Sequence, residues 1–325
     1  MRTFTRVIGA TLIALFAAAL ARDAAAGPLK ELRLDYAYYN PVSLVLKDKG
    51  WLEEDLKKDG VRVVWVLSLG SNKALEFLNA GGLDLGSTAG AAALLGRING
   101  NPIKSVYVYS KPEWTALVTL KDSPIQTVAD LKGQRVAVTR GTDPHIFLVR
   151  TLAEHGLSDK DVRMVLLQHQ DGRLALENGD VIAWAGLDPM MAQMELDLGA
   201  RLFYRNADNN TWGVLNVREE FAAEHPDVVC RVLENYERAR RYALDHPDKL
   251  KAILAEAAKL SDPVAARQLE RTDLSDSSIG EGQQQTIEAA GLALQEAGLI
   301  AADVDVKAAT ASLIDPSFTS ELAPR

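Results

Sequence analysis

Strand-like and helix-like segments alternate along most of this chain, and that alternation is the strongest constraint on its fold. Valine-rich runs such as VRVVWVL have the strand pattern, whereas SNKALEFLNAG spaces its apolar residues as a helix does. Strands that alternate with helices form parallel-rich sheets with helices on their faces. The first alternation predicts strands at 32–38, 61–69, 83–88, 103–110 and 114–120, and helices at 41–60, 71–81 and 91–100.

A second alternation follows, and helices alone fill the end of the chain. We therefore predict an α/β protein of two lobes, with residues 27–112 and 215–325 in lobe 1 and residues 113–214 in lobe 2. The chain crosses between them near 110–115 and 210–217, and the C-terminal helices pack on the first lobe. The second alternation predicts strands at 135–139, 162–168, 181–186, 200–205 and from 213, and helices at 143–156, 171–179, 188–199 and beyond 222.

The first 26 residues have the pattern of a secretory signal peptide. Arg2 and Arg6 precede an apolar run of 15 residues, Val7 to Ala21, and small residues follow it. The run is short for a membrane span. We expect export and cleavage after Ala26, with Ala21 as a second candidate, and an uncleaved N-terminal anchor is the alternative.

Three junctions between a strand and a helix each place glycine beside serine or threonine. They are Gly70-Ser71-Asn72, Gly86-Ser87-Thr88-Ala89-Gly90 and Gly141-Thr142-Asp143-Pro144. The first N–H groups of a helix lack internal acceptors and carry the positive end of its dipole. Since glycine admits a ligand and a hydroxyl adds a donor, such a junction can bind an anion without Lys or Arg. Ligands also bind at the carboxyl ends of strands in open α/β sheets. Ordinary N-capping is the alternative.

Other residues are candidates for the same site, each with a structural alternative. Asp188 either caps the helix that it opens or lies at the rim of a cleft. Trp184 is either a core residue or a pocket wall. His145 is either structural or reaches an anion at the helix start. Residues near the first strand end and the two crossings either pack the hinge or contact the ligand: Tyr38, Tyr39, Asn40, Trp114 and Trp212.

The chain carries none of the common catalytic or metal-binding motifs. It has no HExxH, GxSxG, GxxxxGK[ST] or CxxC, and its five histidines do not cluster at metal-ligand spacing. Its single cysteine, Cys230, lies in a helical pattern and is expected in the core. A net charge of −8 without a long basic run argues against a nucleic-acid partner. We expect no metal, no cofactor and no enzymatic activity.

Taken together, these features make the chain resemble the periplasmic substrate-binding proteins of ABC importers. More narrowly, it resembles the aliphatic-sulfonate-binding family of the nitrate, sulfonate and taurine group, over about residues 30–300. The most specific stretch is DSPIQTVADLKGQRVAVTRGTDPHIFLVRTLAEHGL, in which DSPI, ADLKG, VAV, glycine with threonine, and the following histidine fit the family pattern. The other matching stretches are LVLKDKGWLEEDL, FLNAGGLDLGSTAGAAALL and GDVIAWAGLDPMMAQME.

The resemblance implies a type II periplasmic binding-protein fold whose lobes close on an anion. It also implies a monomer in the periplasm that delivers a small organic anion to an importer permease. Backbone N–H groups and hydroxyls would hold the head group, with Arg140 adding charge. Carried over to this chain, the contacts would be Ser71, Ser87, Thr88, Gly141, Thr142 and His145, with Trp184 and Asp188 at the wall.

Two departures from the family pattern concern the ligand. YAYYNP stands where the family often has Lys or Gln, and WAGLDP replaces WAIWDP, so that Leu187 stands in place of an aromatic wall. Tyr38, Tyr39, Trp114 and Trp212 would suit an organic tail. We expect an alkane- or arylsulfonate, and a pyrimidine precursor of thiamine is the alternative ligand. The alternative functions are an enzyme on the same fold and an effector-binding regulatory domain.

Overall fold

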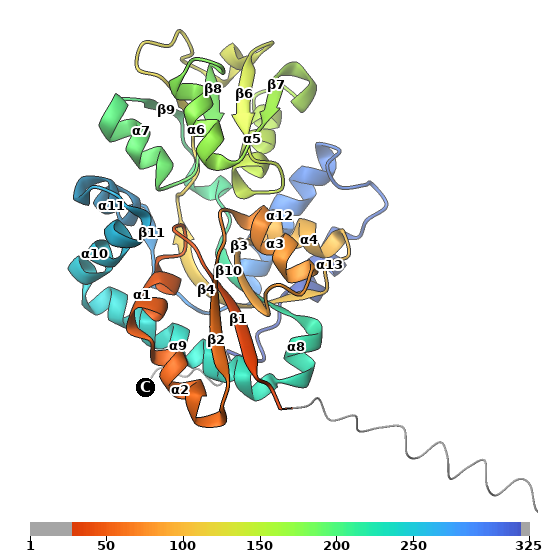
Figure 1. Cartoon of the computed structure of the whole chain (residues 1–325). Helices are drawn as coiled ribbons and strands as arrows, with labels where there is room; N and C mark the ends of the chain where they lie inside the picture. Colours follow the sequence, from red (N-terminus) through yellow and green to blue (C-terminus); the bar gives the residue numbers. More distant parts are fainter. Residues whose placement is uncertain (1–27, 320–325) are drawn as a thin grey trace, which may run out of the picture.

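The computed structural model describes residues 28–319, which form two α/β lobes (Figure 1). The segment with the signal-peptide pattern lies outside these residues. Within residues 28–319, no helix is long and apolar enough to cross a membrane.

A six-stranded sheet forms the centre of lobe 1. Its strands are β1 (Glu31–Tyr36), β2 (Arg62–Leu67), β3 (Leu85–Ala89), β4 (Ile103–Pro112), β10 (Gly213–Arg218) and β11 (Thr272–Asp273). They lie in the order β11-β4-β10-β3-β1-β2. β1 pairs in parallel with β2 and β3, whereas β10 returns from lobe 2 and enters antiparallel between β3 and β4.

A five-stranded sheet forms the centre of lobe 2. Its strands are β5 (Leu117–Thr119), β6 (Arg135–Val138), β7 (Arg163–Leu166), β8 (Ala183–Ala185) and β9 (Arg201–Tyr204). β6 pairs in parallel with β7 and β8, and β5 pairs antiparallel with β8 and β9. The chain crosses between the sheets at 113–116 and 205–212. The second crossing ends before the expected 217, because Gly213 already pairs with both neighbouring strands.

Helices cover both sheets, and the C-terminal ones pack on lobe 1 (Figure 1). Lobe 1 carries α1 (Pro41–Lys49), α2 (Trp51–Leu56), α3 (Ser71–Asn79), α4 (Gly90–Ile98), α8 (Glu219–Glu224), α9 (Pro226–Asp245), α10 (Pro247–Ala258), α11 (Asp262–Leu269), α12 (Glu281–Glu296) and α13 (Val306–Leu313). Lobe 2 carries α5 (Asp143–Glu154), α6 (His169–Glu177) and α7 (Met190–Leu198). α9 packs on α1, and α12 and α13 pack on α4. This arrangement confirms the predicted α/β class.

The single helix expected over 41–60 was wrong, because the chain breaks at Gly50. This residue has a left-handed φ of 62°, and its N–H donates to the Leu46 carbonyl at 3.2 Å, which ends α1. α2 then begins at Trp51. The apolar spacing continues across the break, so periodicity alone could not reveal it.

The two lobes touch through both apolar side chains and helices. Trp114, Ile146 and Leu187 are buried in the same apolar cluster as the residues of β1 and β4. α5 packs against α4 and α12, and α7 packs against α11. The two lobes are therefore in direct contact, and the two crossings connect them.

Replacing Gly213 by alanine is expected to lower the free energy of unfolding by about 1–3 kcal/mol, because overpacking a rigid core has that cost. A Cβ at this position would lie 2.4 Å from Cε2 of Tyr109, a fully buried ring, and 2.8 Å from Oγ of Ser110. Urea denaturation measures the loss. Gly282→Ala is the matched control, since its Cβ meets nothing within 4 Å. Equal stability of the two variants would contradict this prediction.

Candidate functional site

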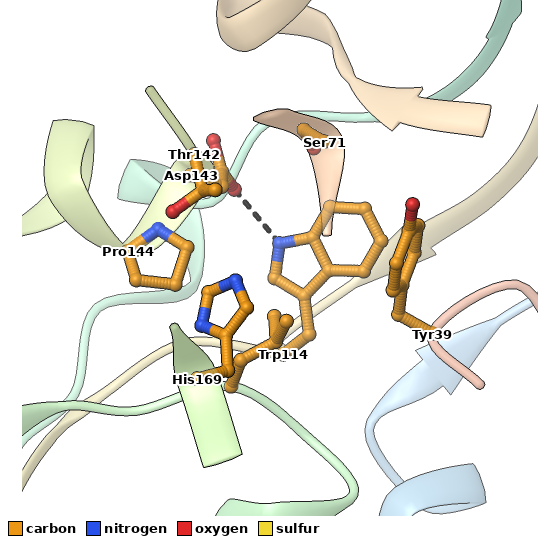
Figure 2. A pocket seen from close by; sticks show the side chains of 8 residues that line it. Tyr39, Ser71, Trp114, Thr142, Asp143, Pro144 and His169 are labelled. Atoms are coloured by element: carbon orange, nitrogen blue, oxygen red, sulfur yellow. Dashed lines mark hydrogen bonds between the residues drawn. The ribbon is translucent and has the colours of Figure 1, made fainter. Parts of the chain in front are cut away.

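A small pocket lies between the lobes, on the side where several strands end (Figure 2). Its volume is about 200 Å³, but the centre of a water molecule fits in only about 10 Å³ of it. That is room for roughly one water. The pocket is lined by Tyr39, Ser71, Trp114, Thr142, Asp143, Pro144, His169 and Leu187.

Lobe 1 contributes the start of α3 to the pocket. The N–H groups of Ser71 and Asn72 have no acceptor within residues 28–319, as expected for the first positions of a helix. Ser71 Oγ accepts the N–H of Ala89 at 3.0 Å, so its own hydroxyl proton remains available to a ligand. This junction therefore has three donors without an acceptor in the described chain, two of them on Ser71, which lines the pocket.

Lobe 2 contributes the start of α5, which faces the start of α3. The N–H groups of Thr142 and Asp143 likewise have no acceptor in the described chain, whereas the Thr142 hydroxyl donates to the Thr139 carbonyl at 2.6 Å. Gly141 has a φ of 77°, and a Cβ there would lie 3.9 Å from Cβ of Asn72. The positive ends of two helices thus meet across the lobes, which favours an anion between them.

Two aromatic rings and an apolar side chain form the rest of the wall. Tyr39 and Trp114 pack edge to face, with ring centroids 5.9 Å apart and planes at 87°. The Tyr39 hydroxyl donates to the Ser87 carbonyl at 3.0 Å, and Trp114 Nε1 donates to Asp143 Oδ2 at 2.8 Å (Figure 2). Both polar atoms are thereby satisfied, so that these rings and Leu187 present apolar surface.

The hydroxyls of the middle junction are used inside lobe 1. Ser87 and Thr88 lie in β3 rather than at a helix start. Ser87 Oγ accepts from Asn40 Nδ2 and donates to Asp35 Oδ1, both at 2.8 Å. Thr88 Oγ1 accepts from Asn216 Nδ2 at 2.8 Å. These side chains hold β1, β3 and β10 together and do not line the pocket.

The start of α4 at the same junction is already covered by the second crossing. The N–H of Gly90 donates to the Trp212 carbonyl at 2.8 Å, and the N–H of Ala91 donates to Thr211 Oγ1 at 3.2 Å. Of the three predicted helix starts, two are therefore open at the pocket and one is closed by the chain itself.

Two buried histidines flank the two open helix starts. His145 does not line the pocket, and its Nδ1 has no partner among the described residues. Burial, assisted by Arg140, lowers the pKa of His145 to about 4. His169 does line the pocket, and burial lowers its pKa to about 3. Both imidazoles are neutral near pH 7.

Three other predicted contacts lie away from the pocket lining. Trp184 is fully buried in lobe 2, and Gly172 packs closely on its indole nitrogen. Asp188 lies one residue before the N-cap of α7, Pro189, and its Oδ1 accepts the N–H of Ala192 at 2.9 Å. Burial raises the pKa of Asp188 to about 7. Trp212 is half-buried on the second crossing.

The pocket brings together only part of the predicted set. It includes Tyr39, Ser71, Trp114 and Thr142, with Gly141 beside them. It also includes residues that were not among the predicted contacts. Asp143 and Pro144 belong to the third junction motif, and Leu187 was noted in the sequence only as a departure from the pattern of the resembled family. No sequence motif indicated His169, because the junction between a strand and a helix where it lies has no glycine beside serine or threonine. Predicted contacts that do not line the pocket are Tyr38, Asn40, Ser87, Thr88, Arg140, His145, Trp184, Asp188 and Trp212.

The electrostatics of the lining come from dipoles rather than from ion pairs. No Lys or Arg belongs to it, and its one carboxyl is Asp143. Burial raises the pKa of Asp143, while hydrogen bonds from Trp114 and Thr211 oppose that shift. Within residues 28–319, no group of three His, Cys, Asp or Glu could hold a metal ion. The site is therefore suited to a single negative charge held by N–H and O–H donors.

Two curated bacterial proteins align with most of the chain. A Bacillus subtilis (strain 168) protein named for binding aliphatic sulfonates is 28% identical over 266 residues, which are 79% of this chain and 80% of that protein. An Escherichia coli (strain K12) protein of the same name is 29% identical over 272 residues, 83% of this chain and 84% of that protein.

Solved structures share the fold. The alkanesulfonate-binding protein of Xanthomonas axonopodis pv. citri, bound to MOPS, superposes with a TM-score of 0.81 at 25% identity. The superposition covers 90% of this chain and 100% of that one.

The NMT1/THI5-like family model matches residues 42–250, which is more than half of the chain. The matched span holds every residue that lines the pocket except Tyr39. This chain therefore belongs to the NMT1/THI5-like family.

Proposed function

We propose that this protein is a periplasmic solute-binding protein that captures an organic sulfonate between its lobes and delivers it to an ABC importer. An alkane- or arylsulfonate is the ligand class. The observation that carries the proposal is the pair of helix starts, α3 and α5, whose free N–H groups face each other across the pocket. Two such dipoles stabilise one negative charge without a cation.

The relatives support the same ligand class. The Bacillus subtilis and Escherichia coli proteins are named for binding aliphatic sulfonates, and the Xanthomonas axonopodis structure holds MOPS, itself an organic sulfonate. The Tyr39–Trp114 pair and Leu187 supply apolar surface for an organic tail. An inorganic anion would leave that surface unused.

Binding requires the lobes to separate, because the pocket has room for only one water. The crossings at 113–116 and 205–212 are where the chain can bend. A ligand that contacts both α3 and α5 favours the closed state over the open one, and the importer then distinguishes the closed surface. In this proposal the protein binds and releases its ligand unchanged.

A thermal-shift panel on the protein without residues 1–26 tests the ligand class. Ligands that bind only the folded state raise the melting temperature by mass action. We expect shifts with ethanesulfonate, taurine and benzenesulfonate, and none with sulfate or nitrate. A shift with an aminopyrimidine alone would preserve the fold and overturn the sulfonate assignment.

Replacing Ser71 by alanine is expected to weaken sulfonate binding by about ten- to a hundred-fold, because a hydrogen bond to a charged group contributes about 1.5–3 kcal/mol. Isothermal titration with ethanesulfonate measures the change. Ser261→Ala is the matched control, since Ser261 is exposed and its side chain makes no cap hydrogen bond. Equal affinities of the two variants would remove the Ser71 hydroxyl from the binding site.

A further inference from the structure

We propose that His169 binds the anionic head of the ligand directly, as a neutral hydrogen-bond donor from lobe 2. This inference rests on the proposed sulfonate site and adds a contact that neither the junction motifs nor the family resemblance indicates. It makes His169 a specificity-determining residue of the pocket, beside the two helix starts.

The geometry places the His169 ring at the point where the lobes meet. The residue opens α6, lines the pocket and is only 2% exposed (Figure 2). Its Nε2 lies 2.9 Å from the position that a Cβ on Gly70 would take, directly before the start of α3. Asn72 Oδ1 lies 2.9 Å from the same position. The imidazole of lobe 2 therefore reaches the anion-binding end of lobe 1.

Neither ring nitrogen of His169 has a hydrogen-bond partner among residues 28–319. Buried polar atoms are almost always paired, since an unpaired one loses its water without compensation. The unpaired N–H of the His169 ring, which borders the pocket, is therefore explained by an acceptor that arrives with the ligand. The sulfonate oxygens are acceptors of the kind that an imidazole N–H requires.

The neutral form of the ring fits this role. The pKa of His169 lies at about 3 because burial removes the water that would stabilise a charged ring. A neutral imidazole always keeps one N–H donor. It can thus contact a single negative charge and leave the lobes free to open when the ligand departs, without an ion pair to break.

Titration with ethanesulfonate at pH 7.5 tests the contact. We expect His169→Leu to bind at least ten-fold more weakly than the wild type, and His169→Gln, which keeps an amide donor, to bind with intermediate affinity. The melting temperature of ligand-free His169→Leu should equal or exceed the wild-type value, because the variant no longer buries unpaired nitrogens. His155→Gln is the matched control, since that ring is exposed and contacts the Thr151 carbonyl.

Binding by His169→Leu within two-fold of the wild type would overturn the inference. If that variant does not fold, imidazole ¹⁵N–¹H spectra of the wild type decide: ethanesulfonate must shift the His169 signals and leave those of His155 in place. Unshifted His169 signals at saturation also overturn the inference. If the wild type binds no sulfonate at all, the proposed ligand class fails first, and this result is distinct from loss of the His169 contact alone.

Discussion

Replacing Asp143 by alanine is expected to lower the free energy of unfolding by about 3–5 kcal/mol, because three buried donors then lose their acceptor at about 1–3 kcal/mol each, less what relaxation recovers. The Asp143 carboxylate is buried. It accepts from Trp114 Nε1 at 2.8 Å, and from the backbone N and Oγ1 of Thr211 at 3.1 and 2.7 Å. Ligand affinity should fall at least ten-fold as well.

The loss of affinity follows from where these three donors lie. Trp114 is on the first crossing between the lobes and Thr211 is on the second, while Asp143 itself begins α5. Thr211 Oγ1 also accepts the N–H of Ala91 at the start of α4. One carboxylate therefore ties a helix of lobe 2 to both hinge segments and, through Thr211, to lobe 1. Without it, the free N–H groups of α5 no longer hold their position opposite α3.

Urea denaturation and titration with ethanesulfonate measure the two effects. Asp180→Ala is the matched control, because Asp180 is exposed in the turn that follows α6. Asp143→Asn should fall between the two, since its amide oxygen can still accept from the Thr211 hydroxyl while its NH₂ group faces the N–H donors of Trp114 and Thr211. If the free energy of unfolding of Asp143→Ala lies within about 0.5 kcal/mol of that of the control, where neutral surface substitutions lie, the hinge role is wrong.

Local patterns predicted the elements of this fold well, because strand and helix periodicity depends on neighbours in sequence. α5 was expected at 143–156 and occupies Asp143–Glu154. What the patterns could not predict are pairings made at long range. β10 inserts antiparallel between β3 and β4, and this choice depends on how the chain returns from lobe 2. The break at Gly50 was missed because the apolar spacing runs through it.

The candidate site also combines features that local sequence predicts with features that depend on long-range contacts. The glycine and hydroxyl signature identified Ser71 and Thr142, whose place at the pocket follows from the strand before them. It could not separate them from Ser87 and Thr88, because the partners of those hydroxyls come from distant segments. His169 could not be predicted as a pocket residue for a related reason. It lies in the pocket because Gly70 of the other lobe packs close to its ring, and that contact depends on how the lobes meet.

A second buried carboxylate joins the lobes on the side of α7, and it leads to a prediction of similar size. Arg271, which lies just before β11 in lobe 1, contacts Asp188 Oδ2 at 3.4 Å and pairs with Glu195 of α7. The side chains of Arg271 and Asp188 are only 6% and 1% exposed. Removing one partner of a buried pair leaves an uncompensated charge, at a cost of about 3–5 kcal/mol. We expect Arg271→Met to lose that much stability at pH 9.

The stability lost in Arg271→Met should increase as the pH rises. Burial raises the pKa of Asp188 from 3.8 to about 7, and Arg271 is the largest influence that opposes this shift, while Glu195 adds to it. A carboxyl with a raised folded pKa contributes stability that is complete below about pH 4 and is lost as pH rises through about 7. Without Arg271 the pKa rises further, so the loss continues at alkaline pH after the wild type has levelled off. The two proteins should therefore differ least near pH 6 and most at pH 9.

Urea midpoints at pH 6 and pH 9 check this expectation, with two further variants as controls. Arg267→Met removes a second partner of Glu195 but no partner of Asp188, and Arg267 is 37% exposed, so its loss should stay below about 1 kcal/mol at both pH values. Asp188→Asn keeps the oxygen that accepts the N–H of Ala192. Combined with Arg271→Met, it removes the buried charge of Asp188 and should abolish the difference between pH 6 and pH 9. A double variant as unstable at pH 9 as Arg271→Met alone would show that packing of the Arg271 side chain, not the charge of Asp188, holds this side of the lobes together.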